Sequence, residues 1–223
     1  MKLIYPKIGN NFNLVKGKIN SIVIEDPFYY EDFILSLYNQ INKKEESLEL
    51  FLDNEKVDLH KYCELVISPM DLTFDKKEFQ KKLYSYLSDE AELNDLVGKL
   101  FNKYGEILSL LDELGHISDY PIEFNNDLDV TDVLKHLDVH IMQPEGRFIE
   151  RLIEYGKTVN RLLGKNILII ANCAAFLDAK EYKYLQEWAA YEEVYVLLLN
   201  NRQNKLNIDL NEFIIDVDLC ELH

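Results

Sequence analysis

Short apolar runs and stretches of helical spacing alternate in the first third of the chain. Apolar runs at 21–25, 48–52 and 63–67 predict three buried strands. Between the first two, apolar residues recur at helical spacing over 28–38, and Pro27 lies where such a helix would begin. This part of the chain therefore predicts strands alternating with a helix.

The pattern changes after Pro69. Apolar residues recur every three or four positions from 71 to about 114, which predicts helices, with Ser88 and Asp89 as the break between two of them. A loop is expected at 115–126, and a short helix at 131–137.

The last third returns to alternating strand and helix. A long helix is predicted over 147–163, and Gly164 follows it as a C-terminal cap. Apolar strands at 166–171 and 193–199 enclose a predicted helix at 178–191. Two strands joined by a helix form a βαβ unit, so they predict a parallel sheet covered on both faces.

These segments together predict an α/β fold with an inserted helical part. Both chain ends form the α/β head, residues 1–70 and 163–223, and residues 71–162 form a helical leg. A further strand at 213–217 is expected at the edge of the head's sheet.

Composition narrows the class of protein. The 223 residues carry a net charge of −16, which argues against a strongly basic nucleic-acid-binding face, although a few clustered cations can still dominate a local field. No apolar run is long enough to span a membrane, and the first residues lack a secretory signal. Three cysteines without a CxxC motif indicate a reducing compartment, so we expect a cytoplasmic protein.

The apolar strand at 167–171 raises the question of nucleotide chemistry, because ATPases of the P-loop class often end such a strand in an acidic residue. Here the strand stops at Asn172. The segment 25–29, which follows the first strand, has no glycine and no lysine, and neither GxxxxGK[ST] nor GxGxxG occurs. HExxH and GxSxG are also absent. We therefore expect no ATP hydrolysis.

Acidic residues gather in the middle of the chain. Residues 105–145 contain ten carboxylates against one basic residue, Lys135. Loop carboxylates at short spacing suit Ca²⁺, which takes six to eight oxygen ligands. The candidate metal ligands are Glu123, Asp127, Asp129 and Asp132. The alternative is that Asp129 or Thr131 caps a helix and the other carboxylates are solvated.

Two histidines offer a second metal hypothesis. His136 and His140 are four residues apart, close to Asp132 and Asp138. His140 is expected beyond the end of the short helix, so the two rings would not share a face.

Basic residues recur along the helix predicted at 147–163. They fall on one side of it and form either a salt-bridged, solvated face or a track for phosphates. These residues are Arg147, Arg151, Lys157, Arg161 and Lys165. A second cluster lies near the start of the helical leg, and its side chains spread around the helix. It consists of Lys76, Lys77, Lys81 and Lys82.

The segment 169–202 resembles a known family. It contains a strand ending in Asn172, then Phe176-Leu177, then Leu185-Gln186-Glu187-Trp188, then a strand followed by Arg202. In this order and spacing it is similar to the Csn2 (Csn-two) family of type II-A CRISPR–Cas systems, which acts in spacer acquisition. The likeness extends to 147–154 and 21–26.

The resemblance implies a P-loop-like head without working nucleotide motifs, and a helical leg. It implies no enzymatic activity. It implies a homotetrameric ring that needs Ca²⁺, binds double-stranded DNA ends without sequence preference, and works beside the Cas integrase subunits and the effector nuclease. The first candidates for DNA contact are Lys135, Arg147 and Arg151, followed by Lys76 and Lys77.

The sequence also departs from the family pattern. Asn200 and Asn201 stand where an acid and a proline are usual, the segment 207–213 replaces a proline-containing tail, and Asn126 replaces an acid beside Asp127. Two other hypotheses remain: a divalent-metal nuclease that uses the four carboxylates, and an acidic protein–protein adaptor with a vestigial ATPase head.

Overall fold

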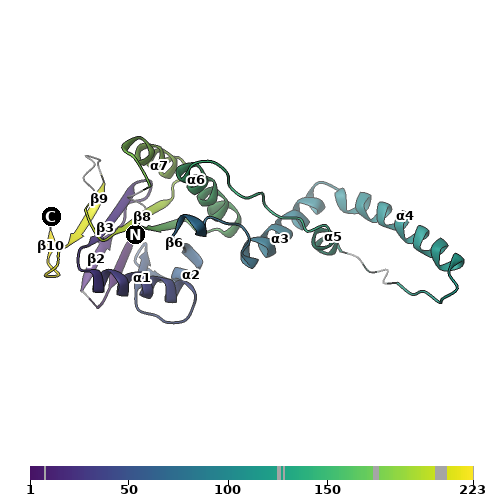
Figure 1. Ribbon diagram of the computed structural model, residues 1–223, viewed down its shortest axis with the longest axis horizontal. Helices are drawn as coiled ribbons and strands as arrows, with labels where there is room; N and C mark the ends of the chain where they lie inside the picture. The colour runs from purple at the N-terminus through teal and green to yellow at the C-terminus, as the bar shows by residue number, and fades with distance from the viewer. Residues whose placement is uncertain (8, 125–126, 128, 173–175, 204–209, 223) are drawn as a thin grey trace. The chain divides into compact units, whose positions relative to one another are not determined.

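The computed structural model describes residues 1–222 except 8, 125–126, 128, 173–175 and 204–209. The predicted features at Asn126, 173–175 and 207–209 therefore lie outside the described residues. The chain forms two compact units: Met1–Thr73 together with Gln143–His223, and Phe74–Met142. We call the first unit the head and the second the leg (Figure 1).

A six-stranded sheet forms the centre of the head. Its strand order is β10-β9-β3-β8-β7-β6, and the five strands from β9 to β6 are parallel. These strands are β3 (Ile19–Ile24), β6 (Cys63–Val66), β7 (Ile167–Ala171), β8 (Tyr195–Asn200), β9 (Asn211–Ile215) and β10 (Glu221–Leu222). Every residue of β3, β7 and β8 is buried, as expected for a parallel sheet covered on both faces. The α/β class and the parallel βαβ unit are confirmed; the likeness to P-loop proteins stays a prediction.

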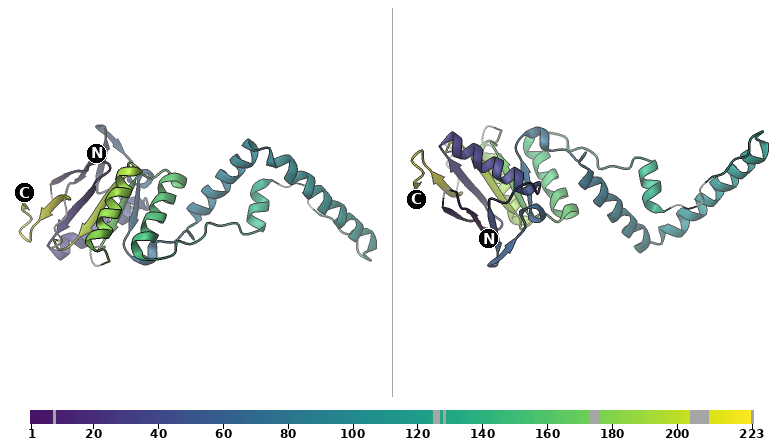
Figure 2. Two further views of the ribbon diagram at one scale, coloured as in Figure 1. Left: turned by 90° about the horizontal axis from the view of Figure 1, so that it is seen from above. Right: turned by 90° about the horizontal axis from the view of Figure 1, so that it is seen from below.

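Helices cover the two faces of this sheet. Figure 2 shows α6 and α7 over one face and α1 over the other. The helices are α1 (Pro27–Ile41), α2 (Leu59–Tyr62), α6 (Phe148–Thr158) and α7 (Ala179–Tyr191). A π-helical turn, Val159–Leu163, extends α6 to Gly164, whose φ of 72° confirms the predicted cap.

A second, antiparallel sheet completes the head. Its strand order is β2-β1-β4-β5, formed by β1 (Lys2–Tyr5), β2 (Asn10–Asn13), β4 (Glu49–Leu52) and β5 (Glu55–Val57). Asp53 and Asn54 have positive φ between β4 and β5, as a tight hairpin turn requires. The inner residues of β1, β2 and β4 join the core under α1, among them Leu3, Phe12 and Leu50.

The leg is built of helices. They are α3 (Lys77–Leu93), α4 (Leu96–Ile117) and α5 (Val130–His136). The break predicted at Ser88 and Asp89 is wrong, because α3 continues to Leu93. The chain turns instead at Asp95, whose φ of 53° lies in the left-handed region. Among the described residues, no helix is long and apolar enough to cross a membrane.

The C-terminal boundary of the leg lies earlier in the chain than the boundary expected at residue 162. It falls after Met142, so α6 is part of the head. The reason is packing: Ile149, Leu152 and Tyr155 of α6 are buried, and Gly156 lies so close to Trp188 of α7 that a methyl group there would meet the indole ring at 2.6 Å. Helical spacing alone did not distinguish a helix of the leg from one packed on the sheet.

Candidate functional site

The turn from β3 into α1 is the place where a phosphate-binding loop would lie in a parallel sheet of this kind. Asp26 caps α1 there, and its Oδ1 accepts hydrogen bonds from the backbone N–H groups of Phe28 at 2.9 Å and Tyr29 at 3.0 Å. Pro27 has no N–H to donate. The chain's own carboxylate therefore occupies the donors that a phosphate would need.

The carboxyl end of β7 is tied to the same helix. The Tyr30 hydroxyl contacts Asn172 Oδ1 at 2.9 Å and donates to the Leu199 carbonyl at 3.0 Å. Asn172 has a φ of 56°, a conformation that asparagine tolerates better than most residues, and its N–H donates to the Leu199 carbonyl. The amide in place of an acid thus has a structural use, because it joins β7, β8 and α1.

The four candidate calcium ligands lie at the end of the leg's loop and on α5. Asp129 is the N-cap of α5, and its Oδ1 accepts the Asp132 N–H at 2.7 Å. Asp132 forms an ion pair with Lys135 at 3.2 Å, while Glu123 and Asp127 are exposed. Within the described ranges, no group of three or more His, Cys, Asp or Glu side chains is placed to hold a metal ion.

The histidine pair separates as expected. His136 ends α5, and His140 lies beyond it with Nδ1 2.7 Å from the Asp138 carbonyl oxygen. The two rings therefore belong to different segments and do not face each other across a helical turn.

The basic residues at 147–165 are largely engaged in ion pairs. Arg147 pairs with Glu181 at 2.8 Å, and Arg161 pairs with Glu192 at 2.7 Å. Both partners belong to α7 or its C-cap, so these pairs join α6 and its π-helical turn to α7. These two ion pairs are those of a salt-bridged face, and contact of the arginines with phosphates stays a prediction.

Lys165 and Arg151 depart from the predicted track. Lys165 is buried and follows the helix instead of lying on its exposed face. Arg151 is half-buried, and its Nε has no hydrogen-bond partner among the described residues. The strip of five cations is thus not a continuous exposed surface.

The other basic candidates lie at the start of the leg. Lys76 is the N-cap of α3 and Lys77 is its first residue, and both are exposed. Lys135 lies on α5 of the same unit and is also exposed. The leg therefore presents exposed cations at the start of α3 and on α5.

Sequence reasoning missed a buried polar group in the head. Lys165 Nζ lies 2.9 Å from Glu64 Oε2, and the Tyr155 hydroxyl donates to Glu64 Oε1 at 2.6 Å. Only 4 % of the lysine side chain and 7 % of the glutamate side chain are exposed. Next to Glu64, burial raises the pKa of the Cys63 thiol, so this cysteine is kept neutral and unreactive. The lone acid in the strand at 63–67 was the available signal.

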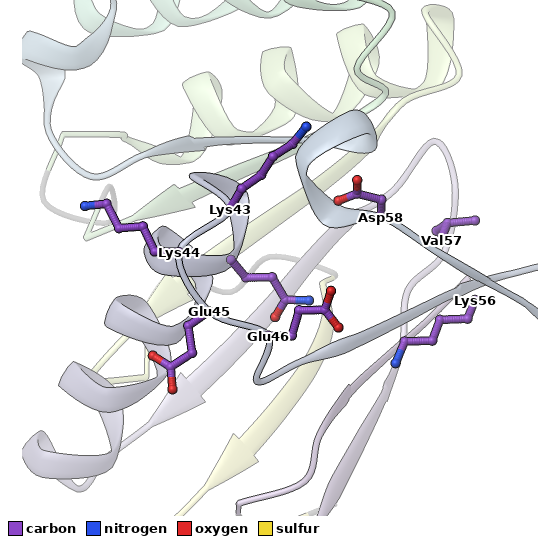
Figure 3. Close-up of a pocket in the computed structure, with 8 residues that line it drawn as sticks. Lys43, Lys44, Glu45, Glu46, Lys56, Val57 and Asp58 are labelled. Atoms are coloured by element: carbon purple, nitrogen blue, oxygen red, sulfur yellow. The ribbon is translucent and has the colours of Figure 1, made fainter.

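A surface hollow of about 630 Å³ lies beside the end of α1 (Figure 3). Lys43, Lys44 and Lys56 line it together with Glu45, Glu46 and Asp58. The formal charges of these three lysines and three carboxylates cancel. The hollow contains none of the predicted site residues.

Comparisons with known proteins converge on one family. The family model Cas_Csn2, described as CRISPR-associated protein, matches residues 40–219. A relative in Streptococcus agalactiae, CRISPR-associated protein Csn2, is 26% identical over 214 residues, which cover 92% of this chain and 90% of the relative.

Two solved structures resemble the fold. Stu0660 of Streptococcus thermophilus has a TM-score of 0.66 at 17% identity, over 100% of this chain and 76% of that chain. The protein cbiO1 from Clostridium perfringens, part of an ABC transporter complex, has a TM-score of only 0.42 at 16% identity, over 92% of this chain and 76% of that chain. The first likeness shows a shared fold, and the second is too weak to support a conclusion.

Proposed function

Because the chain belongs to the Csn2 family of CRISPR-associated proteins, we propose that it binds the ends of double-stranded DNA without sequence preference and without catalysis. It does so as a homotetrameric ring that depends on Ca²⁺. The ring acts in the acquisition of new spacers for antiviral defence, beside the Cas integrase subunits and the type II effector nuclease.

The observation that carries this proposal is the exposure of α4. This helix of 22 residues is rich in leucine and isoleucine, yet it contains no buried residue. An amphipathic helix gains most of its stability by burying its apolar face, so α4 needs a partner beyond the residues that the structure describes in one chain. A further copy of the same chain is the partner that a homotetramer provides.

Exposed cations of the leg and of α6 support the DNA-binding part. Lys135 keeps 58 % of its side chain exposed and Arg147 keeps 71 %, although each pairs with a carboxylate. Such surface pairs are weak, and a phosphate can replace the carboxylate. A ring repeats each cation four times around one hole, so a locally positive channel is compatible with a chain of charge −16. Phosphate contacts carry no sequence information.

The non-catalytic part is supported by the turn at Asp26. Its carboxylate satisfies the N–H groups that would otherwise be available to a nucleotide phosphate. The parallel sheet then serves as a scaffold that holds the surfaces used for assembly.

In the ring, Ca²⁺ would be shared between copies of the chain. The described carboxylates of one chain do not surround an ion, so the residues Glu123, Asp127, Asp129 and Asp132 would each contribute at a junction. When bound, Ca²⁺ supplies positive charge that lets clustered carboxylates of neighbouring subunits approach each other.

The test is a gel shift that compares linear DNA with covalently closed circular DNA, first with Ca²⁺ and then with chelator. Retention of linear DNA alone, lost on chelation, is the expected result. Lys135→Glu should weaken retention, whereas the matched change Lys18→Glu on the head should not. Equal binding of both forms would indicate an open groove, no binding would favour the adaptor, and degradation with Mg²⁺ or Mn²⁺ would favour the nuclease. Each of these three results would overturn the proposal.

A further inference from the structure

A second hollow, of about 330 Å³, lies within the leg. Its lining comes from the two residues at 74–75, from the opening turns of α3 and from the segment 138–141 that follows α5. All of these residues belong to the compact unit Phe74–Met142, and we call this space the leg hollow. Its volume lies at the lower end of the range of small-molecule pockets.

The floor of the leg hollow is apolar. The rings of Phe74 and Phe79 pack edge to face with their centroids 5.2 Å apart, and only 5 % and 1 % of the two residues are exposed. Leu83 and Ile141 are half-buried and complete the apolar lining. A molecule with an apolar stem would therefore gain free energy by placing that stem in the hollow.

The exposed rim offers hydrogen-bond acceptors, and the lining contains neither lysine nor arginine. Asp75 and Asp138 supply carboxylates. His140 Nδ1 lies 2.7 Å from the Asp138 carbonyl oxygen, which only accepts, so Nδ1 carries the proton and Nε2 of the neutral ring is an acceptor. Gln80 Nε2 donates to the Tyr84 hydroxyl at 3.0 Å, which makes Gln80 Oε1 the acceptor of that amide.

This arrangement suits an organic cation better than a metal ion. In the described part of the chain, Asp75, Asp138 and His140 do not form a group that could hold a metal ion, so their acceptors are spread around the rim instead of meeting at one point. A guanidinium directs five N–H donors outward in a plane, whereas an ammonium is a compact charge with three donors. Spread acceptors of net negative charge therefore favour the guanidinium.

We infer that the leg hollow binds an alkylguanidinium group. The alkyl stem lies against Phe79 and Leu83, and the guanidinium lies at the rim, where Asp75 and Asp138 accept its N–H groups. The same chemistry is offered by a free small molecule and by an arginine side chain of a partner protein. The inference does not rest on the proposed DNA binding, because it uses none of the candidate DNA contacts and none of the candidate calcium ligands.

The first probe is n-butylguanidinium, titrated into the full chain and followed by saturation-transfer NMR at pH 8, where imidazoles are neutral. We expect saturable binding. Binding of n-butylammonium, which has the same stem and a compact charge, should be weaker by about threefold or more. The neutral n-butylurea has a similar shape and should not bind detectably, because it cannot form charge-assisted hydrogen bonds. No binding of n-butylguanidinium, or equal binding of the urea, would overturn the inference.

Substitutions at the exposed Gln80 test the rim. Gln80→Glu adds a carboxylate and should tighten the binding of n-butylguanidinium by about threefold, whereas Gln80→Lys adds an ammonium and should weaken it by a similar factor. Both new residues are good helix formers, so α3 should keep its stability. The control pair is Ser85→Glu and Ser85→Lys, at an exposed position of α3 outside the hollow, and it should leave the affinity unchanged. Equal effects at the two positions would show that the ligand responds only to the overall charge, which contradicts the inference.

Asp138→Asn removes one carboxylate and leaves the backbone in place, because asparagine tolerates the φ of 49° found at Asp138. Binding of n-butylguanidinium should weaken by about fivefold. Asp89→Asn removes an exposed carboxylate of α3 that does not line the hollow, and it should have no effect. Unchanged affinity in Asp138→Asn would refute the assignment of the guanidinium to this rim.

A peptide probe identifies the source of the group. Acetyl-Gly-Arg-Gly-amide presents the alkylguanidinium as a side chain, and its affinity is compared with that of n-butylguanidinium. Tighter binding of the peptide would support an arginine of a partner protein as the ligand, and tighter binding of n-butylguanidinium would support a free small molecule. Binding of either probe that does not respond to Gln80→Lys and Asp138→Asn would place the ligand elsewhere and overturn the inference.

Discussion

Helices α6 and α4 are both amphipathic, but their apolar sides lie in different environments. The apolar side of α6 is buried in the head, where Ile149 is 4 % exposed and Leu152 is 0 % exposed. The apolar side of α4 in the leg is open, and none of its residues is buried. The same kind of pattern in the sequence therefore leads to a buried apolar side in one unit and to an exposed apolar side in the other.

The difference shows what a helical pattern does and does not specify. Recurring apolar positions require a partner of some kind, because the burial of the apolar side supplies most of a helix's stability. They do not say whether the partner is a sheet of the same chain or another chain. In the head, the sheet is the partner that covers the apolar sides of α6 and α7. In the leg, the described residues cover the apolar side of α4 only in part.

The largest loss of stability in the head is expected when the charge of Glu64 is removed. Glu64→Gln leaves the Lys165 ammonium buried without its counter-charge, which we expect to cost about 3–5 kcal/mol in the free energy of unfolding. Urea unfolding measures this loss. The double variant Glu64→Gln with Lys165→Met should recover most of it, while Lys16→Ala at the exposed pair with Glu193 should leave the midpoint unchanged. A single variant as stable as the wild type would show that the buried pair is not ionised.

Matched leucine deletions compare the two helices directly. Leu152→Ala creates a cavity in the head, so we expect a loss of about 2–5 kcal/mol in unfolding free energy. Leu110→Ala removes the same atoms from an exposed position, and it should leave the unfolding of dilute, dissociated protein almost unchanged. At high protein concentration, Leu110→Ala should instead lower the associated fraction in sedimentation. Equal losses in dilute solution would show that α4 is already packed within one chain.

Two helix caps give a smaller and more selective comparison. Asp26→Ala and Asp129→Ala each remove a carboxylate that accepts backbone N–H groups at a helix start, at a cost of about 0.5–2 kcal/mol. Only Asp129→Ala should also reduce the effect of Ca²⁺ on assembly, since only this residue belongs to the candidate metal ligands. Thermal unfolding with and without Ca²⁺ would measure both effects. The same calcium response in the two variants would remove Asp129 from the ligand set.

The smallest expected effect is the pH dependence at Asp32 in the head. Burial opposes its ionisation, but hydrogen bonds from Lys7, at 2.8 Å, and from Tyr5 hold its pKa below the ordinary value. Because its folded-state pKa is lowered, Asp32 contributes stability above the unfolded pKa of about 4 and loses it as pH falls through the folded pKa. Asp32→Asn should therefore show a flatter loss of stability below about pH 4 in acid titrations. An unchanged acid limb would rule out this contribution.

Several elements were predictable because their signals are local. The strands at 166–171 and 193–199, the helix between them and the cap at Gly164 follow from apolar runs, from Asp178 as an N-cap and from one glycine of positive φ. Strands β1 and β2 were missed, because they are four residues long and half of β2's pattern, Asn-Asn-Phe-Asn, is exposed. They become recognisable only in the folded chain, where β1 pairs with both β2 and β4 over the common core.

The candidate site also has features that the sequence predicted and features that it did not. The sequence showed that the β3–α1 turn lacks a phosphate loop, and the structure shows that the Asp26 carboxylate accepts the N–H groups of this turn. The sequence also placed five cations along one helix, but it did not reveal that Glu181, Glu192 and Glu64 lie opposite three of them. Ion pairs between residues far apart in the chain depend on which elements pack together, and a period of 3.6 residues does not contain this information.

The sequence by itself determined the family, the α/β class, the absence of nucleotide-binding motifs and the presence of a helical insertion, since each depends on residue types at short spacing. Tertiary structure alone decided that α6 belongs to the head, that Lys165 is buried against Glu64, and that the described residues bury no side chain of α4. The physical reason is that burial is a property of neighbours in space. Hydrophobic spacing along a helix fixes which side is apolar, and only the packed structure shows whether that side is buried.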